Sequence, residues 1–296
     1  MFKRILATAV LGGCFLNNIC FGADALVYGV VLPNSSHDLS KSILKKLSEN
    51  GTQSKMPIEL KLFPTKADEL SAVKENPSLI KYVNIQYEVN AIQSALGRPL
   101  KVHIFSSYKD ELSAVQKNPD LLTFMYIKDQ FIPDAAKIPH WGSVAQVLTL
   151  APNTHRQSKT FSSYLITVKN SKINNLTDLS DKTVTYYDAE STSNYLAVKQ
   201  LLADQKITGV HWIKANDLKQ AFTMVESGKA DVLGTWHQFF MNNPNKNNFK
   251  VIYTIPNLTN PVFFANTSEL NPDEIKRVKA QLELIGSKTQ ETFTYE

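Results

Sequence analysis

Cysteine is scarce in this sequence: there are two among 296 residues, Cys14 and Cys20, and both lie near the start. Glycine and proline are also few, with 11 and 13 residues, while hydrophobic residues make up 43% of the chain and charged ones 20%. This composition excludes a collagen-like, low-complexity or disordered chain. A chain of this length and hydrophobic content can bury a sizeable core, and we expect two.

A large excess of one charge is lacking as well. The 32 basic and 27 acidic residues give a formal net charge of +5. Two of the basic residues, Lys3 and Arg4, lie in a segment that we expect to be removed, which leaves +3. Because this small excess is spread along the chain, it excludes a nucleic-acid-binding surface. It is compatible with an anionic small ligand.

The first residues have the pattern of an export signal. A positive segment, Lys3-Arg4, precedes a run over residues 5–16 that is apolar or small throughout. Twelve such residues are too few to cross a bilayer as a stable helix. Small residues then stand at the −3 and −1 positions before Ala23, as a cleavage site requires. We therefore predict a signal peptide over residues 1–22 and a periplasmic location.

A lipoprotein box is the competing interpretation of this segment. The run Leu11-Gly12-Gly13-Cys14 would place a lipid on Cys14. Against it, the apolar stretch before Cys14 is short, and Phe15-Leu16 would make an unusually apolar tether. Cleavage before Ala23 would instead remove both cysteines, and with them disulfides, thiol catalysis and cysteine-ligated metal sites.

The segment that follows alternates between strand-like and helix-like patterns. Buried-strand patterns cover residues 25–32, 58–63 and 79–83. Helical spacing covers residues 40–47 and 67–74. Strands that alternate with helices of this length are typical of a parallel or mixed α/β sheet covered on both faces.

The second half carries an α/β set of its own. The expected strands are 164–168, 183–187, 230–233 and 251–255, and the expected helices are 194–203, 218–226 and 272–284. Asn271 is the expected N-cap of the last helix, with Pro272 at its first position. Two α/β sets joined by extended segments predict two lobes, and the cleft between them is the expected ligand site.

An internal repeat with a period of 42 residues lies in the first half. The matching segments are 57–63 with 99–105, 68–73 with 110–115, and 76–79 with 118–121. We interpret residues 57–79 and 99–121 as a tandem duplication that adds strands to one lobe. The copies differ at one informative position, where Lys66 of the first corresponds to Tyr108 of the second.

Signatures of enzymes and metal sites are mostly absent from the sequence. It contains no Gly-x-Gly-x-x-Gly, no Gly-x-x-x-x-Gly-Lys and no Gly-x-Ser-x-Gly. The six histidines never pair at the i, i+4 spacing of a helical metal site. The paired carboxylates Asp68-Glu69 and Asp110-Glu111 stand at helix N-termini, where a favourable interaction with the helix dipole explains them. We therefore predict no catalytic residue, metal or cofactor.

The segment Ser191-Thr192-Ser193 is the strongest candidate for a binding site. It follows a strand and opens a helix, so it offers three hydroxyls beside unpaired backbone N–H groups. Such a segment can bind phosphate or phosphonate oxygens, although an ordinary serine N-cap has the same pattern. Tyr108, Tyr126 and Tyr164 stand at or just beyond strand ends, where their hydroxyls can donate to the same oxygens or simply pack.

These residues carry a resemblance to a known family. The runs 164–168, 173–179, 191–195 and 225–232 resemble the phosphonate, phosphite and phosphate substrate-binding proteins of ABC importers. The resemblance covers about residues 99–285 and extends more loosely from Ala25. It implies a type II periplasmic-binding-protein fold of two α/β lobes, with lobe 1 over residues 23–160 and 254–296 and lobe 2 over residues 161–253.

The resemblance also implies roles for particular residues. Ser191, Thr192 and Ser193 would hold the phosphonate oxygens, and Tyr108 and Tyr164 would complete the cage. Since only the second repeat copy has the tyrosine, it is the copy expected to line the ligand.

The departures from the family pattern concern the amine of an aminophosphonate. Leu218 stands where binders of such ligands have a histidine, and Gln238 and Asn260 stand where they have two acids. Neutral amides do not compensate a buried ammonium as carboxylates do. We therefore expect a ligand without an amine, and we expect Trp236 and His237 nearby to shape a smaller or more apolar pocket.

The sequence thus predicts an exported, monomeric solute receptor that delivers an anionic phosphorus compound to an inner-membrane permease. A sensor or scavenging module of the same fold with an altered ligand is one alternative, suggested by the lost amine-binding residues. A periplasmic enzyme with a rare active site is the other. Turnover of candidate substrates would distinguish the enzyme from a receptor.

Overall fold

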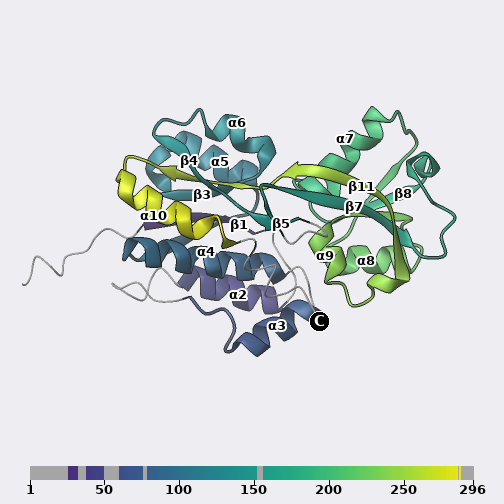
Figure 1. The fold of residues 1–296 in the computed structure, drawn as a ribbon, viewed down its shortest axis with the longest axis horizontal. Helices are drawn as coiled ribbons and strands as arrows, with labels where there is room; N and C mark the ends of the chain where they lie inside the picture. The colour runs from purple at the N-terminus through teal and green to yellow at the C-terminus, as the bar shows by residue number, and fades with distance from the viewer. Residues whose placement is uncertain are drawn as a thin grey trace, which may run out of the picture.

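The computed structural model describes residues 26–32, 38–49, 60–75, 79–151, 156–285 and 287. It has two lobes, each built around a five-stranded mixed sheet, as Figure 1 shows. The predicted signal peptide and Cys14 lie outside the described residues. Within the described ranges, no helix is long and apolar enough to span a membrane.

The first sheet belongs to lobe 1 and has the order β2-β1-β3-β12-β4. Its strands are β1 (Leu26–Val31), β2 (Leu100–Phe105), β3 (Phe124–Ile127), β4 (Trp141–Gln146) and β12 (Val262–Asn266). β1 runs parallel to β2 and β3, and β12 runs antiparallel to β3 and β4.

Helices cover both faces of this sheet. They are α2 (Asp38–Glu49), α3 (Lys66–Glu75), α4 (Ile80–Leu96), α5 (Tyr108–Lys117), α6 (Ile132–Ala135) and α10 (Pro272–Leu282). α2, α4 and α10 pack on one face through a large apolar core, while α5 and α6 pack on the other (Figure 1). The expected covering of a mixed sheet on both sides is confirmed.

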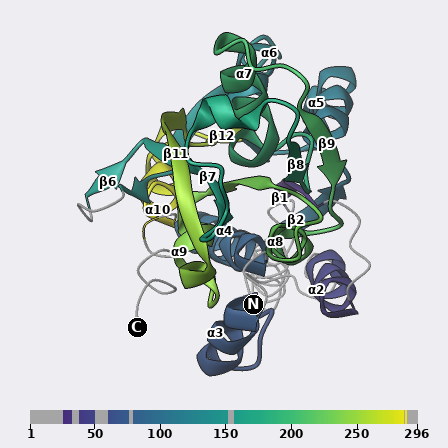
Figure 2. The same cartoon turned by 90° about the vertical axis from the view of Figure 1, so that its right-hand side faces the viewer.

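The second sheet belongs to lobe 2 and has the order β11-β7-β10-β8-β9. Its strands are β7 (Thr160–Val168), β8 (Thr183–Tyr186), β9 (His211–Lys214), β10 (Val232–Trp236) and β11 (Phe249–Thr259). The helices of this lobe are α7 (Ala197–Asp204), α8 (Leu218–Glu226) and α9 (His237–Met241). α7 packs on one face, and α8 and α9 pack on the other (Figure 2). Between β4 and β7 lies the short hairpin β5 (Thr149–Leu150) and β6 (Gln157–Ser158).

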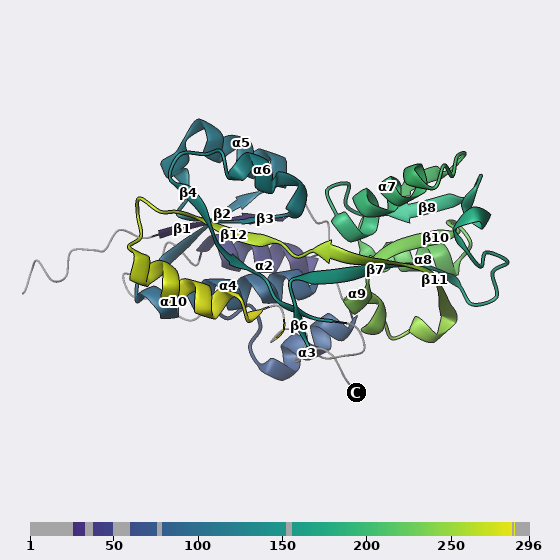
Figure 3. The same cartoon turned by 45° about the horizontal axis from the view of Figure 1, so that its top comes forward.

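Two chain segments pass between the lobes side by side. One runs from β4 through the β5–β6 hairpin into β7, and the other runs from β11 into β12, as Figure 3 shows. They are joined by backbone hydrogen bonds, since the amide of Asn260 donates to the carbonyl of Lys159 at 3.0 Å. β11 pairs with β7 as far as Thr259, so the lobe boundary expected at residue 254 falls inside a continuous strand.

Two strands expected in the first half are wrong. Residues 79–83 begin helix α4, and the described part of 58–63 is irregular chain rather than a strand. The amides of Leu60 and Leu62 donate to side chains of α4, those of Asn90 and Gln86, instead of to a neighbouring strand. A short apolar run cannot be assigned by periodicity alone. The helix is revealed only by the continued spacing of its buried residues, at 79, 82, 83, 85, 86, 88, 89, 92 and 93.

The two repeat copies therefore fold differently. Helices α3 and α5 correspond, but the second copy has strand β2 before its helix, whereas the described residues of the first copy include no strand. The expectation that the duplication adds strands to lobe 1 is wrong for these residues. What the described residues of the first copy contribute is helix α3 and Leu79, the N-cap of α4.

Each duplicated acid pair consists of an exposed residue and a buried one. Asp68 and Asp110 lie in the first turns of α3 and α5, as expected. Glu69 and Glu111 are instead buried, with 3% and 0% of their surface exposed, so the helix dipole alone does not explain them. Glu69 accepts hydrogen bonds from neighbours on α4, whereas both carboxyl oxygens of Glu111 lack a partner among the described residues. Burial raises the pKa of Glu111 well above its usual value.

The last helix begins as the sequence predicts. The side chain of Asn271 accepts a hydrogen bond from the amide of Glu274, whose carboxylate accepts one from the amide of Asn271. Pro272 stands at the first helical position, where a missing N–H costs nothing. This capping box fixes the start of α10, which packs against α4 beneath the sheet of lobe 1.

Candidate functional site

A cavity of about 490 Å³ lies between the two lobes. Lobe 1 lines it with the end of β1, one face of α4, the start of α5 and the end of β3. Lobe 2 contributes residues 187–193, which follow β8, together with Phe161, Lys214, Trp236 and Phe239. The segments that connect the lobes complete the lining with Val147, Thr149 and residues 259–261.

The segment Ser191-Thr192-Ser193 lines this cavity. β8 ends at Tyr186, and a π-helical turn over Thr192–Leu196 leads from the loop into α7. Ser191 is an N-cap, because its hydroxyl oxygen accepts a hydrogen bond from the amide of Asn194 at 3.2 Å. The segment is thus a helix cap and also part of the cavity wall, so the two interpretations of its pattern are compatible.

Buried contacts fix the position of this turn on the sheet of lobe 2. Asn194 is fully buried, its side-chain oxygen accepts from the amide of Tyr187, and its nitrogen donates to the carbonyl of Gly234, both at 2.7 Å. Ser163 donates from its hydroxyl to the carbonyl of Ser193 at 2.6 Å. A Cβ at Gly234 would lie 3.1 Å from that same carbonyl oxygen and 2.5 Å from a methyl of Val198, so this close approach requires glycine.

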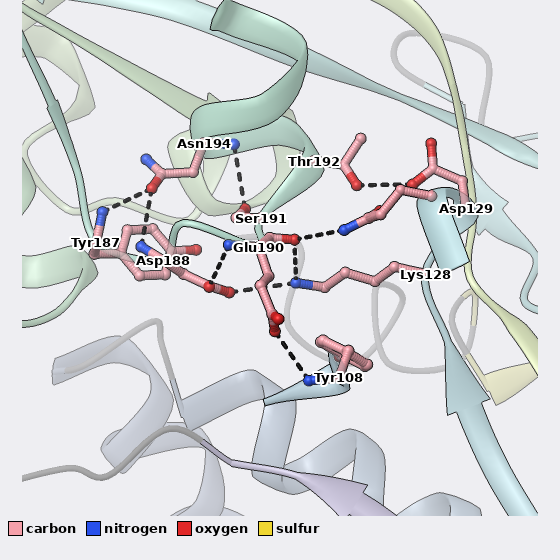
Figure 4. A network of polar contacts seen from close by, with 10 residues as sticks. Tyr108, Lys128, Asp129, Tyr187, Asp188, Glu190, Ser191, Thr192 and Asn194 are labelled. Atoms are coloured by element: carbon pink, nitrogen blue, oxygen red, sulfur yellow. Dashed lines mark hydrogen bonds and ion pairs between the residues drawn. The ribbon is translucent and has the colours of Figure 1, made fainter. Parts of the chain in front are cut away.

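Polar contacts join the two lobes across the cavity, as Figure 4 shows. The ammonium of Lys128, at the end of β3, lies 3.3 Å from Oδ2 of Asp188 and 2.8 Å from the carbonyl oxygen of Glu190. The carboxylate of Glu190 accepts a hydrogen bond from the amide of Tyr108 at 2.9 Å. The hydroxyl of Thr192 donates to Oδ1 of Asp129 at 3.0 Å.

Burial and pairing shift the ionisation of the central ion pair in this network. Burial lowers the pKa of Lys128, against the attraction of Asp188. Burial alone would raise the pKa of Asp188, but the charge of Lys128 and a hydrogen bond from the amide of Glu190 lower it below its usual value. Asp188 is therefore held as a carboxylate beside the Lys128 ammonium.

The expected site residues divide into two groups. Those that line the cavity are Ser191, Thr192, Ser193, Tyr108, Tyr126 and Asn260. Tyr164 and Gln238 lie outside its lining. Tyr164 packs against His237 and Phe240, with ring centroids 6.1 and 5.8 Å apart, and Gln238 is buried in α9.

The neighbouring residues singled out from the sequence divide in the same way. Trp236 lines the cavity, whereas His237 is buried behind it with Nδ1 3.3 Å from the carbonyl oxygen of Ser162. Leu218 lies in the apolar core of lobe 2. Asn260 lines the cavity, and its amide nitrogen donates to the hydroxyl of Thr149 and to the carbonyl of Ser158, both at 3.0 Å.

Sequence reasoning missed the contribution of α4. Lys81, Asn84, Ile85 and Glu88 line the cavity at the i, i+3, i+4 and i+7 spacing of one helix face. The helical spacing of Lys81, Asn84 and Glu88 is visible in the sequence, but it was overlooked because residues 79–83 were expected to form a strand. Glu88 accepts a hydrogen bond from the hydroxyl of Tyr28 at 2.6 Å. Burial raises the pKa of Glu88 to about 7.

The arrangement is that of a binding cavity with many polar groups on its walls. Across the part of the chain that the structure describes, no group of three or more histidine, cysteine or acidic side chains could hold a metal ion. The walls instead offer hydroxyls, tyrosines and lysines from both lobes, which can hydrogen-bond to a small anion.

Comparisons with known proteins agree with this fold. XAC2383 from Xanthomonas citri, in a structure with chloride, matches with 14% identity and a TM-score of 0.55 over 91% of this chain and 88% of its own. PhnD1 from Prochlorococcus marinus, in complex with methylphosphonate, matches with 15% identity, the same TM-score and the same coverage. At such identities the likeness shows the fold, a two-lobe type II periplasmic binding protein.

The family comes from the sequence itself. No curated protein sequence matches this chain. Residues 85–292, which include most of lobe 1 and all of lobe 2, match the family of periplasmic phosphonate substrate-binding proteins of ABC transporters. The resemblance noted from the sequence is confirmed, and the chain belongs to this family of substrate-binding proteins.

Proposed function

We propose that this protein binds a phosphorus oxyanion in the cavity between its lobes and carries it, without catalysis, to an ABC permease in the inner membrane. The observation that carries the proposal is the Ser191–Ser193 turn, whose three residues line the cavity. Buried contacts to Asn194, Ser163 and Gly234 support this turn, so its hydroxyls and amides are oriented in advance. Donors preorganised in this way suit an anion with several oxygens.

In the proposed site the turn in lobe 2 holds the oxyanion and tyrosines of lobe 1 approach it from the other side. Tyr108 stands at the start of α5 and Tyr126 in β3, and both line the cavity. Burial raises the pKa of both tyrosines, so they stay protonated and act as hydrogen-bond donors. Tyr164 and Gln238 have no place in this proposal, because they lie outside the cavity lining.

The proposed ligand has no amine. Four acidic side chains line the cavity, but each has a partner: Asp129 accepts from Thr192, Asp188 from Lys128, Glu190 from the Tyr108 amide, and Glu88 from Tyr28. Asn260, where binders of aminophosphonates have an acid, is neutral and directs its amide protons to Thr149 and Ser158. Asn260 thus offers an ammonium no carboxylate, and the acids of the cavity are each already engaged by a protein donor.

Binding is proposed to close the lobes around the ligand, as in hinged two-lobe receptors. We assign residues 23–160 and the C-terminal segment to lobe 1 and the residues between them to lobe 2. Because β11 pairs with β7 through Thr259, we place the return to lobe 1 at Asn260 rather than at residue 254. The mature protein is proposed to act as a periplasmic monomer that begins at Ala23, which N-terminal sequencing of the exported protein would check.

A sensor or scavenging module of the same fold is the second candidate. It is favoured by the network of Lys128, Asp188 and Glu190, which already links the lobes through protein groups alone. Thermal-shift measurements separate the two candidates. A receptor should be stabilised by phosphorus oxyanions in proportion to occupancy, whereas a module with an altered ligand should not.

Alanine substitutions in the turn test the proposed site. Hydrogen bonds to a charged group contribute about 1.5–3 kcal/mol each, so Thr192→Ala and Ser193→Ala should weaken methylphosphonate binding roughly ten-fold or more. The matched control is Thr223→Ala, which removes an exposed hydroxyl from α8 in the same lobe. If calorimetry gives all three variants the affinity of the wild type, the turn is only a helix cap and the proposed site is wrong.

A further inference from the structure

Lys81 is a cavity lysine for which the structure provides no partner. It stands in the first turn of α4 with its side chain half-buried in the cavity wall. Among the described residues it forms no hydrogen bond or ion pair. The other two lysines of the cavity differ, since Lys128 pairs with Asp188 and Lys214 is exposed.

Charged groups lie near the ammonium of Lys81, but no described carboxylate contacts it. Burial lowers the pKa of Lys81, and repulsion from Lys128 acts in the same direction. Asp188 and Asp217 oppose this shift, but the Oδ2 atom of Asp188 already contacts Lys128. Asp188 therefore acts on Lys81 only from a distance, while Glu190 and Asp129 add further negative charge near Lys128. An anion that contacts the Lys81 ammonium directly would stabilise it.

The same helix face has a second incomplete polar group. The side-chain oxygen of Asn84, one turn after Lys81, is buried and accepts no hydrogen bond from any described residue. Buried polar groups in proteins nearly always have partners. The buried Asn84 oxygen and the Lys81 ammonium, neither with a partner among the described residues, lie on one face of α4 in the cavity wall, which indicates that a bound molecule and its water complete this part of the site.

We infer that Lys81 is the counter-ion of the ligand, pairing from lobe 1 with the oxyanion that Ser191–Ser193 hold from lobe 2, and that it selects doubly over singly charged phosphorus oxyanions. This inference rests on the proposed function. The turn offers neutral donors, which can hold a monoanion or a dianion. The ammonium of Lys81 adds a full charge, which favours the second negative charge of a dianion.

A counter-ion role predicts opposite effects on binding and on stability. A half-buried ammonium without a protein partner costs free energy in the protein alone, and a ligand that pairs with it offsets that cost. Lys81→Met keeps the aliphatic stem and removes the charge. It should therefore raise the melting temperature of the protein alone while weakening its binding of the dianion.

The test compares two probes on the mature protein by calorimetry at a pH where methylphosphonate is a dianion. The second probe is its monomethyl ester, which carries one charge. Lys81→Met should weaken methylphosphonate binding roughly ten-fold or more but leave binding of the ester nearly unchanged. Lys81→Arg should retain most of the preference for the dianion. The control Lys117→Met removes an exposed lysine at the end of α5, in the same lobe but outside the cavity lining, and should keep the wild-type ratio of the two affinities.

The outcomes separate this inference from the function on which it rests. If the wild type binds methylphosphonate and Lys81→Met keeps the wild-type ratio of affinities, the role of Lys81 is overturned and the proposed function stands. A Lys81→Met protein that melts at a lower temperature and loses both probes equally shows a structural lysine, which also overturns it. If the wild type binds neither probe, the proposed function fails and the inference fails with it.

Discussion

The ammonium of Lys128 lies 3.3 Å from Oδ2 of Asp188, and this ion pair joins strand β3 of lobe 1 to the loop after β8 of lobe 2. Lys128 also reaches the carbonyl oxygen of Glu190, two residues before Thr192. The inter-lobe contact and the proposed oxyanion turn therefore belong to one loop. A substitution that breaks the ion pair should therefore shift the oxyanion turn, and a substitution in the turn should shift the ion pair, because the loop is short and both of its ends are held by hydrogen bonds.

Asp188→Asn should weaken the contact between the lobes. It leaves the mostly buried Lys128 ammonium without its carboxylate, at a cost of up to about 3 kcal/mol. We expect a larger radius of gyration by small-angle X-ray scattering and weaker binding of methylphosphonate. The control is Asp134→Asn, which removes an exposed ion pair with Lys137 within lobe 1 and should change neither quantity. An unchanged radius of gyration in Asp188→Asn would show that the ion pair does not hold the lobes together.

Glu88→Gln should alter how stability depends on pH. Burial raises the pKa of Glu88 from 4.5 to about 7 in the folded protein, so between these values the folded state binds more protons than the unfolded one. The titration of Glu88 should therefore lower the free energy of unfolding of the wild type by up to about 3 kcal/mol as pH rises from 4.5 to 7. Glutamine can still accept the hydrogen bond from Tyr28.

Urea unfolding at pH 5 and pH 8 checks this expectation. The Glu88→Gln variant should resemble the wild type at pH 5 and be the more stable protein at pH 8. A stability difference that is the same at both pH values would mean that Glu88 does not titrate in this range.

His237 should produce the opposite dependence at lower pH. Burial lowers the pKa of His237 from 6.5 to about 4, although hydrogen bonds that the imidazole donates to the backbone of Ser162 and Leu150 act against this shift. Its neutral form is thus favoured in the folded protein, and the stability it contributes is present above pH 6.5 and lost as pH falls towards 4. His237→Gln should flatten the decline in melting temperature between these values. The exposed control His211→Gln should leave that decline in place.

The amine prediction can be tested with Asn260. Wild-type protein should bind methylphosphonate, phosphite or phosphate more tightly than 2-aminoethylphosphonate, because the neutral Asn260 offers the ammonium no carboxylate. Asn260→Asp supplies a carboxylate in the cavity and should reduce the difference in affinity between the amine-free ligands and 2-aminoethylphosphonate. Calorimetry of the four ligands at one pH and one salt concentration gives the ranking. The preference is wrong if 2-aminoethylphosphonate is the tightest ligand of the wild type.

Much of the fold was predictable because local signals and tertiary packing agree. The strands at 164–168 and 183–187 lie in the buried middle of a sheet, and continuous apolar runs of this length are typical of such strands. The start of the last helix follows from Asn271 and Pro272, whose preferences are set by the backbone itself. Helix α4 was missed because residues 79–83 are mostly apolar and β-compatible, with Lys81 as the one charged residue, and the helical face appears only over a longer window.

The site was predictable where it depends on a local motif and not where it depends on lobe packing. Ser191–Ser193 are recognisable because a strand, a hydroxyl segment and a helix follow one another directly. Lys81 and Glu88 reach the cavity only because α4 packs beneath β1, which no local pattern indicates. Tyr164 stands in a strand where side chains alternate between faces, and its packing against His237 and Phe240 turns it away from the cavity lining.

The central claim, that the cavity binds a phosphorus oxyanion, is tested most directly by calorimetric titration of the mature wild-type protein with methylphosphonate. The account predicts saturable binding of one ligand per protein, a matching rise in melting temperature, and no turnover of the ligand. Absence of both heat and thermal shift with methylphosphonate, phosphite and phosphate would contradict it, and would favour the module with an altered ligand.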